Sequence, residues 1–143
     1  FDKNNKCSLN APWLATMIGN LSVERELLIK IGLFDENFKS WGCEHFEIGY
    51  RFFKNMNLSF FRIIEAPSFH IAHRREEFFY ENALKVSHNY FKSKHNDLSV
   101  QLLLPLLEGE ITLGEFDTRL HKTPNNLNES INDVYVKNIS RNN

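Results

Sequence analysis

The stretch GNLSVERELLIKIGLFDENFKSWGCEHFEIGYRF, residues 19–52, carries the features on which the fold of this chain depends. Near its start, Ser22 is a suitable helix N-cap, and apolar residues follow it at helical spacing. Gly32 comes directly after the last of these apolar residues, where a glycine commonly ends a helix. The sequence therefore predicts a helix over 23–31.

A second helix is predicted over 44–56, directly after the tripeptide Trp-Gly-Cys at 41–43. Its first turn contains Glu44 and Glu47, whose negative charges suit the positive end of the helix dipole. Glu47 and Arg51 are four residues apart, so their side chains can pair on one face of the helix.

Outside this stretch, two apolar segments rich in β-branched or aromatic residues, 14–18 and 58–64, are predicted to be strands. Helical spacing predicts helices over 76–95, over 98–107, where Pro105 bends or ends the helix, and over 113–121. The Asn- and Ser-rich residues from 123 onward predict a flexible tail. The predicted class is α/β, with units at 1–97, 98–122 and 123–143.

Composition excludes several classes of function. The chain has 143 residues, 42% of them hydrophobic, and a net charge of -1, which is typical of one soluble domain without a field that attracts nucleic acid. It contains no apolar run long enough for a membrane span. Two distant cysteines favour a reducing, cytoplasmic setting. Because the first residue is Phe1 and not Met, we expect that the chain begins inside a longer protein, or after processing.

Three local patterns each allow a structural and a functional interpretation. The turn at Asn20 is a strand-to-helix connection, or a place where a ligand approaches the backbone. The segment from Trp41 to His45 is a helix start covered by an aromatic ring, or a pocket in which Glu44 or His45 takes a proton from a hydroxyl.

The third pattern is the pair His70 and His73, three residues apart in a predicted connector. The two imidazoles are structural, or they contribute to a metal site. Zinc usually needs three or four protein ligands, and no completing set is evident. A hard divalent cation could instead take one histidine together with carboxylates and phosphate oxygens.

Taken in order, these patterns resemble the second half of the family 2 glycosyltransferases with the GT-A fold, and are similar to the C-terminal domain of the β-1,4-galactosyltransferase group. Those families show G-N-x-S-x-x-R, then G-G-F-D-E-x-F, then W-G-x-E-D-x-E-L-G-x-R, and a histidine after the next strand. The resemblance covers about Trp13 to His73. Leu33 replaces the second glycine of the middle motif.

The resemblance implies site residues. The Glu-Asp pair of the family binds the acceptor hydroxyl and supplies the catalytic base, and here it reads Glu44-His45, so either residue could be the base. Trp41 would form the wall of the acceptor pocket, and the acceptor-binding residues would also include Gly42, Asn20 and Arg51.

The family histidine after the strand ligates the catalytic metal. His73 matches it best, and His70 occupies a position that can also be a ligand. The implied cofactor is Mn²⁺ or Mg²⁺, with a UDP-sugar as donor substrate. Arg74 and Arg75 follow His73, as basic residues commonly do in the family.

The family also holds the metal and the donor diphosphate with an Asp-x-Asp motif, which occurs nowhere in this chain. The expected protein is therefore the C-terminal, acceptor-side part of a glycosyltransferase, inactive alone. Its expected partners are a nucleotide-sugar donor, a glycan or other hydroxyl acceptor, and an upstream nucleotide-binding half of the same protein. One alternative is a non-catalytic glycan- or protein-binding module, and another is a helical interaction domain that uses 76–95 and 102–107.

Overall fold

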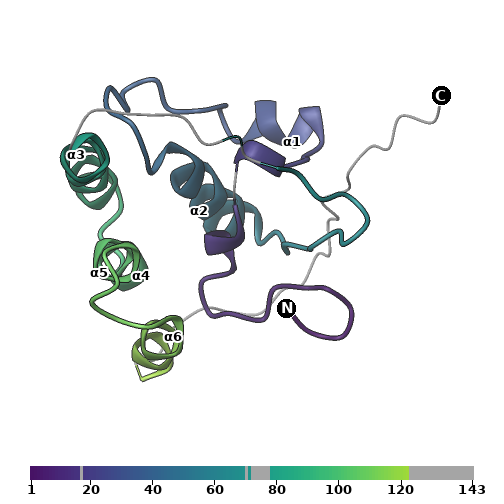
Figure 1. The fold of residues 1–143 in the computed structure, drawn as a ribbon. Coiled ribbons are helices and arrows are strands. Elements are labelled where there is room, and N and C mark those ends of the chain that lie inside the picture. The colour runs from purple at the N-terminus through teal and green to yellow at the C-terminus, as the bar shows by residue number, and fades with distance from the viewer. Residues whose placement is uncertain (17, 70, 72–77, 123–143) are drawn as a thin grey trace.

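Helices make up the regular secondary structure in the computed structural model, which describes residues 1–16, 18–69, 71 and 78–122 (Figure 1). In chain order, these residues form the short 3-10 helices η1 (Pro12–Ala15) and η2 (Ile18–Asn20), and the α-helices α1 (Arg25–Lys30), α2 (Glu44–Met56), α3 (Phe79–Lys94), α4 (Leu98–Gln101), α5 (Leu103–Leu107) and α6 (Leu113–His121). None of these helices is long and apolar enough to cross a membrane.

The helix α2 lies in the middle of the molecule, with α3 to one side and α1 to the other (Figure 1). The indole of Trp13 in η1 is fully buried against it. Phe46, Tyr50 and Phe91 meet this indole edge-on, with ring centroids 5.8–6.1 Å away. Edge-to-face packing of this kind adds to the stabilisation from burial of apolar surface, so Trp13 forms the centre of the core.

The backbones of α2 and η1 approach each other closely at Gly49. A Cβ atom at this position would lie 2.0 Å from Oγ1 of Thr16, closer than any real contact. Thr16 is fully buried, and its hydroxyl donates to the carbonyl of Trp13 at 2.6 Å. Only glycine therefore lets α2 pack at this distance.

The predicted strand over 14–18 is wrong for the residues that the structure describes. Leu14 and Ala15 belong to η1, and Ile18 begins η2. Pro12 fixes a backbone angle suited to a helical first turn, and both the amide and the hydroxyl of Thr16 donate back to Trp13. These local hydrogen bonds favour a tight turn over an extended chain.

The predicted strand over 58–64 is also wrong, although the segment keeps a strand-like alternation at its start. Leu58 and Phe60 are buried, and Phe61 forms an isolated antiparallel bridge with Lys6. The amide of Cys7 donates to the carbonyl of Phe60 at 2.7 Å. The amide of Arg62 donates to the carbonyl of Asn5 in the same N-terminal loop, and within the described residues these contacts do not extend into a ladder.

Each segment predicted to be helical contains a helix in the structure, although some bounds differ. Those over 44–56 and 113–121 are confirmed at both ends. The first helix is confirmed as α1 but is shorter than 23–31, and the prediction of Ser22 as its N-cap is wrong because Glu24 holds that place. Gly32 follows the helix with φ of +91°, as expected of a residue that ends one.

The third predicted helix, over 76–95, is confirmed as α3, although Glu76 lies outside the described residues. The segment 98–107 forms two helices, α4 and α5, which meet at Leu102. Pro105 has no N–H to donate to the carbonyl of Gln101, which accounts for the bend one turn earlier. The predicted tail over 123–143 also lies outside the described residues.

The helices α4 to α6 pack on the same core as the rest of the chain. Val100, Leu103 and Phe116 are fully buried and belong to one cluster with Trp13. A hydrogen bond from the amide of Asn10 to Asp117, at 2.8 Å, ties the N-terminal loop to α6.

Candidate acceptor site

The backbone turn before α2 has an uncommon geometry. Gly42 has φ of +97° and Cys43 has φ of +67°, so two successive residues adopt left-handed conformations. Such a conformation is unfavourable for Cys43, and residues of this kind are often found at functional sites. The turn places Glu44 at the first position of α2. Burial raises the pKa of the Cys43 thiol to about 12, which leaves it unreactive.

Side chains of α3 hold this turn in place. The hydroxyl of Ser87 donates to the carbonyls of Ser40 and Trp41, at 2.9 and 3.1 Å. A Cβ atom on Gly42 would lie 3.3 Å from Leu84, so the turn rests directly on that helix. The position of Glu44 therefore depends on the docking of α3.

Glu44 and His45 are neighbours at the N-terminus of α2. Oε1 of Glu44 is 3.9 Å from Nδ1 of His45, which is longer than a hydrogen bond. The interaction with His45 lowers the pKa of Glu44, so that its carboxylate is ionised at neutral pH. Oε2 of Glu44 is buried and has no hydrogen-bond partner among the residues described, whereas the side chain as a whole is 29% exposed. An ionised carboxylate that is partly exposed can accept a proton or a hydrogen bond from a ligand hydroxyl.

Trp41 presents an aromatic surface in the turn that leads into α2, three residues before Glu44. Its side chain is 42% exposed, and its ring meets Tyr80 of α3 at a centroid distance of 4.7 Å. Phe79 lies 6.4 Å from the same indole. An exposed aromatic ring and an ionised carboxylate three residues apart in one turn are groups that can bind a sugar, whose C–H face packs on a ring while its hydroxyls donate to oxygens.

Asn20 occupies a different hollow. A cavity of about 160 Å³ is lined by Asn20, Ser22, Arg62 and their neighbours, and none of the residues from 41 to 45 lines it. The side-chain amide of Asn20 donates to the carbonyl of Ala66 at 2.8 Å. The structure thus joins Asn20 to the loop after Phe60 and does not bring it to Trp41.

Arg51 lies on α2 and is 9% exposed, with its guanidinium in contact with protein groups. Nε donates to Glu47 at 2.9 Å, and the two terminal nitrogens donate to the carbonyls of Ile31 and Leu33, each at 2.6 Å. This confirms the predicted pairing with Glu47. Arg51 therefore fixes the loop after α1 against α2, and that loop leads to Trp41.

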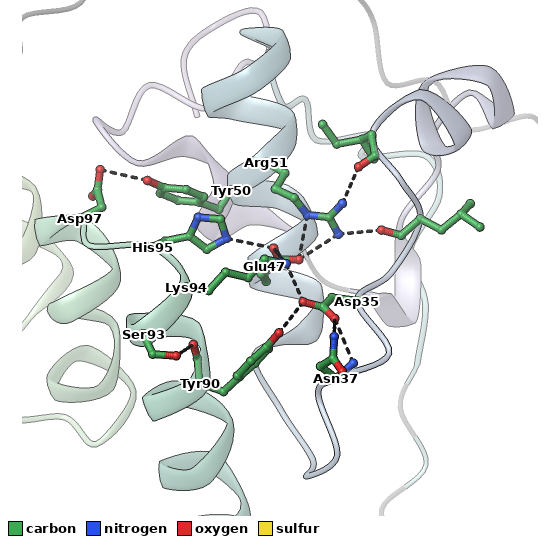
Figure 2. A network of polar contacts seen from close by, with 12 residues as sticks. Asp35, Asn37, Glu47, Tyr50, Arg51, Tyr90, Ser93, Lys94, His95 and Asp97 are labelled. Carbon is green, nitrogen blue, oxygen red and sulfur yellow. Dashed lines mark hydrogen bonds and ion pairs between the residues drawn. The ribbon is translucent and has the colours of Figure 1, made fainter.

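Glu47 is the centre of a polar network that the sequence did not reveal (Figure 2). Its side chain is fully buried, and Oε1 lies 2.8 Å from Nζ of Lys94 and 3.0 Å from Nε2 of His95. Burial alone would raise the pKa of Glu47, but the hydrogen bonds from His95, Lys94 and Arg51 outweigh it and lower the pKa to about 2. The carboxylate is therefore charged at any physiological pH.

Asp35 belongs to the same network, and Figure 2 shows it between Lys94 and Tyr90. Lys94 makes ion pairs with both Asp35 and Glu47, and the hydroxyl of Tyr90 donates to Asp35 at 2.8 Å. The hydrogen bond from Lys94 lowers the pKa of Asp35 well below its usual range. The last turn of α3 thus joins the turn at Phe34-Asp35-Glu36 to α2. Lys94 and His95 gave no sequence signal, because their partners Asp35 and Glu47 lie 47–59 positions away.

The two predicted metal ligands, His70 and His73, lie outside the described residues. Within the described part of the chain, no group of three or more His, Cys, Asp or Glu side chains could hold a metal ion. The residues that can be placed therefore do not by themselves form a metal centre.

Comparison with known proteins gives two partial similarities. The chain is 39% identical over 66 residues to a chondroitin synthase of Pasteurella multocida (strain Pm70), and 38% identical over 66 residues to a hyaluronan synthase of Pasteurella multocida. Each match covers 46% of this chain and only 7% of the relative. No family model and no solved structure matches. These two synthases are glycosyltransferases, and the similarity supports a glycosyltransferase-like function.

Proposed function

We propose that this chain is the acceptor-side part of a GT-A glycosyltransferase that transfers a sugar from a nucleotide-sugar to a hydroxyl group. The observation that carries the proposal is the ionised, partly exposed carboxylate of Glu44 at the first position of α2, three residues after the exposed ring of Trp41. The partial similarity to two synthases supports the same reaction class.

In this proposal, Glu44 acts as the base. The acceptor oxygen attacks the anomeric carbon of the donor, its proton passes to Glu44, and the bond from that carbon to the diphosphate breaks. Trp41 holds the acceptor sugar, so that the attacking hydroxyl points at the carboxylate. His45 faces Oε1 and orients the carboxylate. Displacement from the opposite side inverts the anomeric centre.

The buried network around Glu47 would hold Trp41 and Glu44 in fixed positions relative to each other. Arg51 and Glu47 fix the preceding loop to α2, and Lys94 fixes both to α3. Arg51 is thus proposed as a positioning residue rather than one that touches the acceptor, because its nitrogens already donate to protein oxygens.

The donor side is proposed to lie in a segment outside this chain, since the 66 matched residues correspond to only 7% of the length of each relative. A nucleotide-sugar, with Mn²⁺ or Mg²⁺, would bind there, and His73 with His70 would contribute from this chain. Titration of the parent protein with UDP and Mn²⁺ tests this part. We expect His73→Ala to weaken the binding, and unchanged binding would contradict the metal assignment.

The first prediction concerns Glu44 in the parent protein. Glu44→Gln keeps the shape of the side chain but removes the base, so transfer from a panel of UDP-sugars should fall about 10²–10⁴-fold in kcat. Donor binding should be unchanged, because Glu44 does not contact the donor diphosphate in this mechanism. Rates are measured by release of UDP, and binding by calorimetry.

Glu26→Gln is the matched control, since Glu26 is an exposed glutamate in the first turn of α1. It should leave the rate unchanged. A Glu44→Gln enzyme with full activity would contradict the role of Glu44. A parent protein that binds glycans but never turns over would favour the alternative of a non-catalytic binding module, which the presence of His45 in place of aspartate suggests.

A further inference from the structure

The helices α3 and α5 lie next to each other in the fold (Figure 1). A groove is lined by residues from the first half of α3, from the end of α5 and from the turn after α5. Its volume is about 620 Å³, within the range of about 300–1,000 Å³ that is typical of ligand sites. Its lining residues are Tyr80, Leu84, Lys85, Leu107, Glu108 and Glu110. No role in the proposed mechanism has been given to any of them.

The groove continues from the candidate acceptor site. Tyr80 lines the groove and also packs edge-on against Trp41, at a centroid distance of 4.7 Å. Leu84 lines the groove and also meets the backbone at Gly42. A chain that leaves the site past Trp41 would therefore meet Tyr80 and Leu84, which belong to both places.

The lining has the chemistry of a carbohydrate site. Tyr80 and Leu107 are 43% and 42% exposed, and provide apolar surface for the C–H faces of sugar rings. Glu108 and Glu110 can accept hydrogen bonds from hydroxyls, and Lys85 can donate them. Nζ of Lys85 lies 3.6 Å from Oε1 of Glu108, so these two lining residues form an ion pair.

The charge of the lining selects among carbohydrates. The lining contains one lysine and two glutamates, so its net charge is -1. A chain that carries uronate groups would meet like charge at Glu110, whereas a neutral chain would meet only hydrogen-bonding groups.

We propose that this groove is a subsite for the growing end of a neutral oligosaccharide acceptor, whose terminal residue sits at Trp41 and Glu44. This inference rests on the proposed function, because it extends the same acceptor site by several sugar units. Binding energy from these distant units would hold the terminal hydroxyl in place for attack.

Titration of the 143-residue chain with three probes tests the inference: N-acetylglucosamine, its neutral β-linked tetramer, and tetragalacturonic acid. Calorimetry gives affinities, and NMR follows the indole of Trp41 and the methyl groups of Leu84 and Leu107. We expect the neutral tetramer to bind about tenfold more tightly than the monosaccharide, a difference of one strong contact. It should shift all three signals, while the monosaccharide shifts that of Trp41 alone.

Two variants locate the effect. Leu107→Ser should remove the advantage of the tetramer and leave the affinity for the monosaccharide unchanged. Glu110→Lys reverses the charge of the lining, and should make tetragalacturonic acid bind better than it does to the unmodified chain. Val86→Ala, at an exposed position of α3 that does not line the groove, is the control and should change nothing.

The outcomes separate this inference from the proposed function. If monosaccharide and tetramer bind equally and shift only Trp41, the groove subsite is overturned while the acceptor site stands. If neither probe shifts Trp41, the acceptor site of the proposed function is overturned as well. Tighter binding of tetragalacturonic acid than of the neutral tetramer to the unmodified chain would overturn the charge selection.

Discussion

Glu47 shows how one buried residue can hold several elements together. It is fully buried, yet Arg51, Lys94 and His95 all reach its carboxylate. An isolated carboxylate at this depth would be very unfavourable, but the carboxylate of Glu47 is compensated by cations that also donate hydrogen bonds to it. Removal of the central charge would leave the buried guanidinium of Arg51 and the ammonium of Lys94 with reduced compensation.

Glu47→Gln is therefore expected to lower the free energy of unfolding by about 3 kcal/mol, the size of effect seen when one partner of a buried ion pair is lost. Urea denaturation followed by circular dichroism measures it. The matched control is Glu26→Gln, which removes an exposed glutamate from the first turn of α1 and should change stability by less than about 0.5 kcal/mol. Equal effects of the two variants would show that the network contributes little.

At the scale of elements, the contact of α2 with η1 depends on the absence of one side chain. Gly49→Ala would place a methyl group 2.0 Å from the hydroxyl of Thr16. In an exposed helix the same change stabilises by about 1 kcal/mol, so the sign of the effect reports the packing. We expect Gly49→Ala to destabilise the chain by about 1–3 kcal/mol, as overpacking does.

Gly114→Ala provides the comparison within the same molecule. Gly114 lies in α6, and a Cβ atom there would meet nothing closer than Thr112 at 4.0 Å. This variant should raise the melting temperature, while Gly49→Ala lowers it. A rise in both would mean that η1 moves freely away from α2.

The elements also show which parts of the fold could be predicted. The helices α2 and α6 carry strong local signals, namely acidic residues in the first turn and, in α6, the capping box of Thr112 and Glu115, so their bounds were predicted correctly. Residues 14–18 are apolar enough for a strand, but Pro12 and Thr16 decide their conformation through hydrogen bonds that a hydrophobic pattern does not contain. Residues 58–64 lack a partner ladder in the described structure, and a partner is a non-local property.

The candidate site likewise contains residues that the sequence predicted and residues that it did not. Trp41, Glu44 and His45 are consecutive or nearly so, and a sequence pattern was enough to single them out. Lys94 and His95 complete the support of that site from α3, far away in sequence. Their importance depends on the docking of two helices, which no local pattern encodes.

The whole molecule should lose stability in acid, starting with His88. Its ring is 3% exposed, Nε2 donates to the carbonyl of Val100 at 2.7 Å, and Nδ1 has no partner among the described residues. Burial lowers the pKa of His88, so the folded state favours the neutral ring. The contribution of the neutral ring is fully present above the ordinary pKa of 6.5 and is lost as pH falls below it.

We therefore expect the urea midpoint to fall between pH 7.5 and pH 5.5, and to fall less in His88→Gln, which has no ring to protonate. His121→Gln, at the exposed end of α6, should behave like the unmodified chain. If His88→Gln and the unmodified chain lose equal stability over this range, the assignment to His88 is contradicted. Glu47 acts at lower pH, since its carboxylate contributes above about pH 4.5 and is lost toward its folded pKa of about 2.

The ion pairs of Lys94 also have a consequence for synthesis of the protein. Asp35 and Glu47 emerge from the ribosome long before Lys94 and His95, which are separated from them by 59 and 48 positions. Until then the two carboxylates have only part of their compensation, so the loop that carries Trp41 cannot settle on α2. A nascent chain that stops at residue 73 would contain every motif of the glycosyltransferase pattern, yet its acceptor site would still be unassembled.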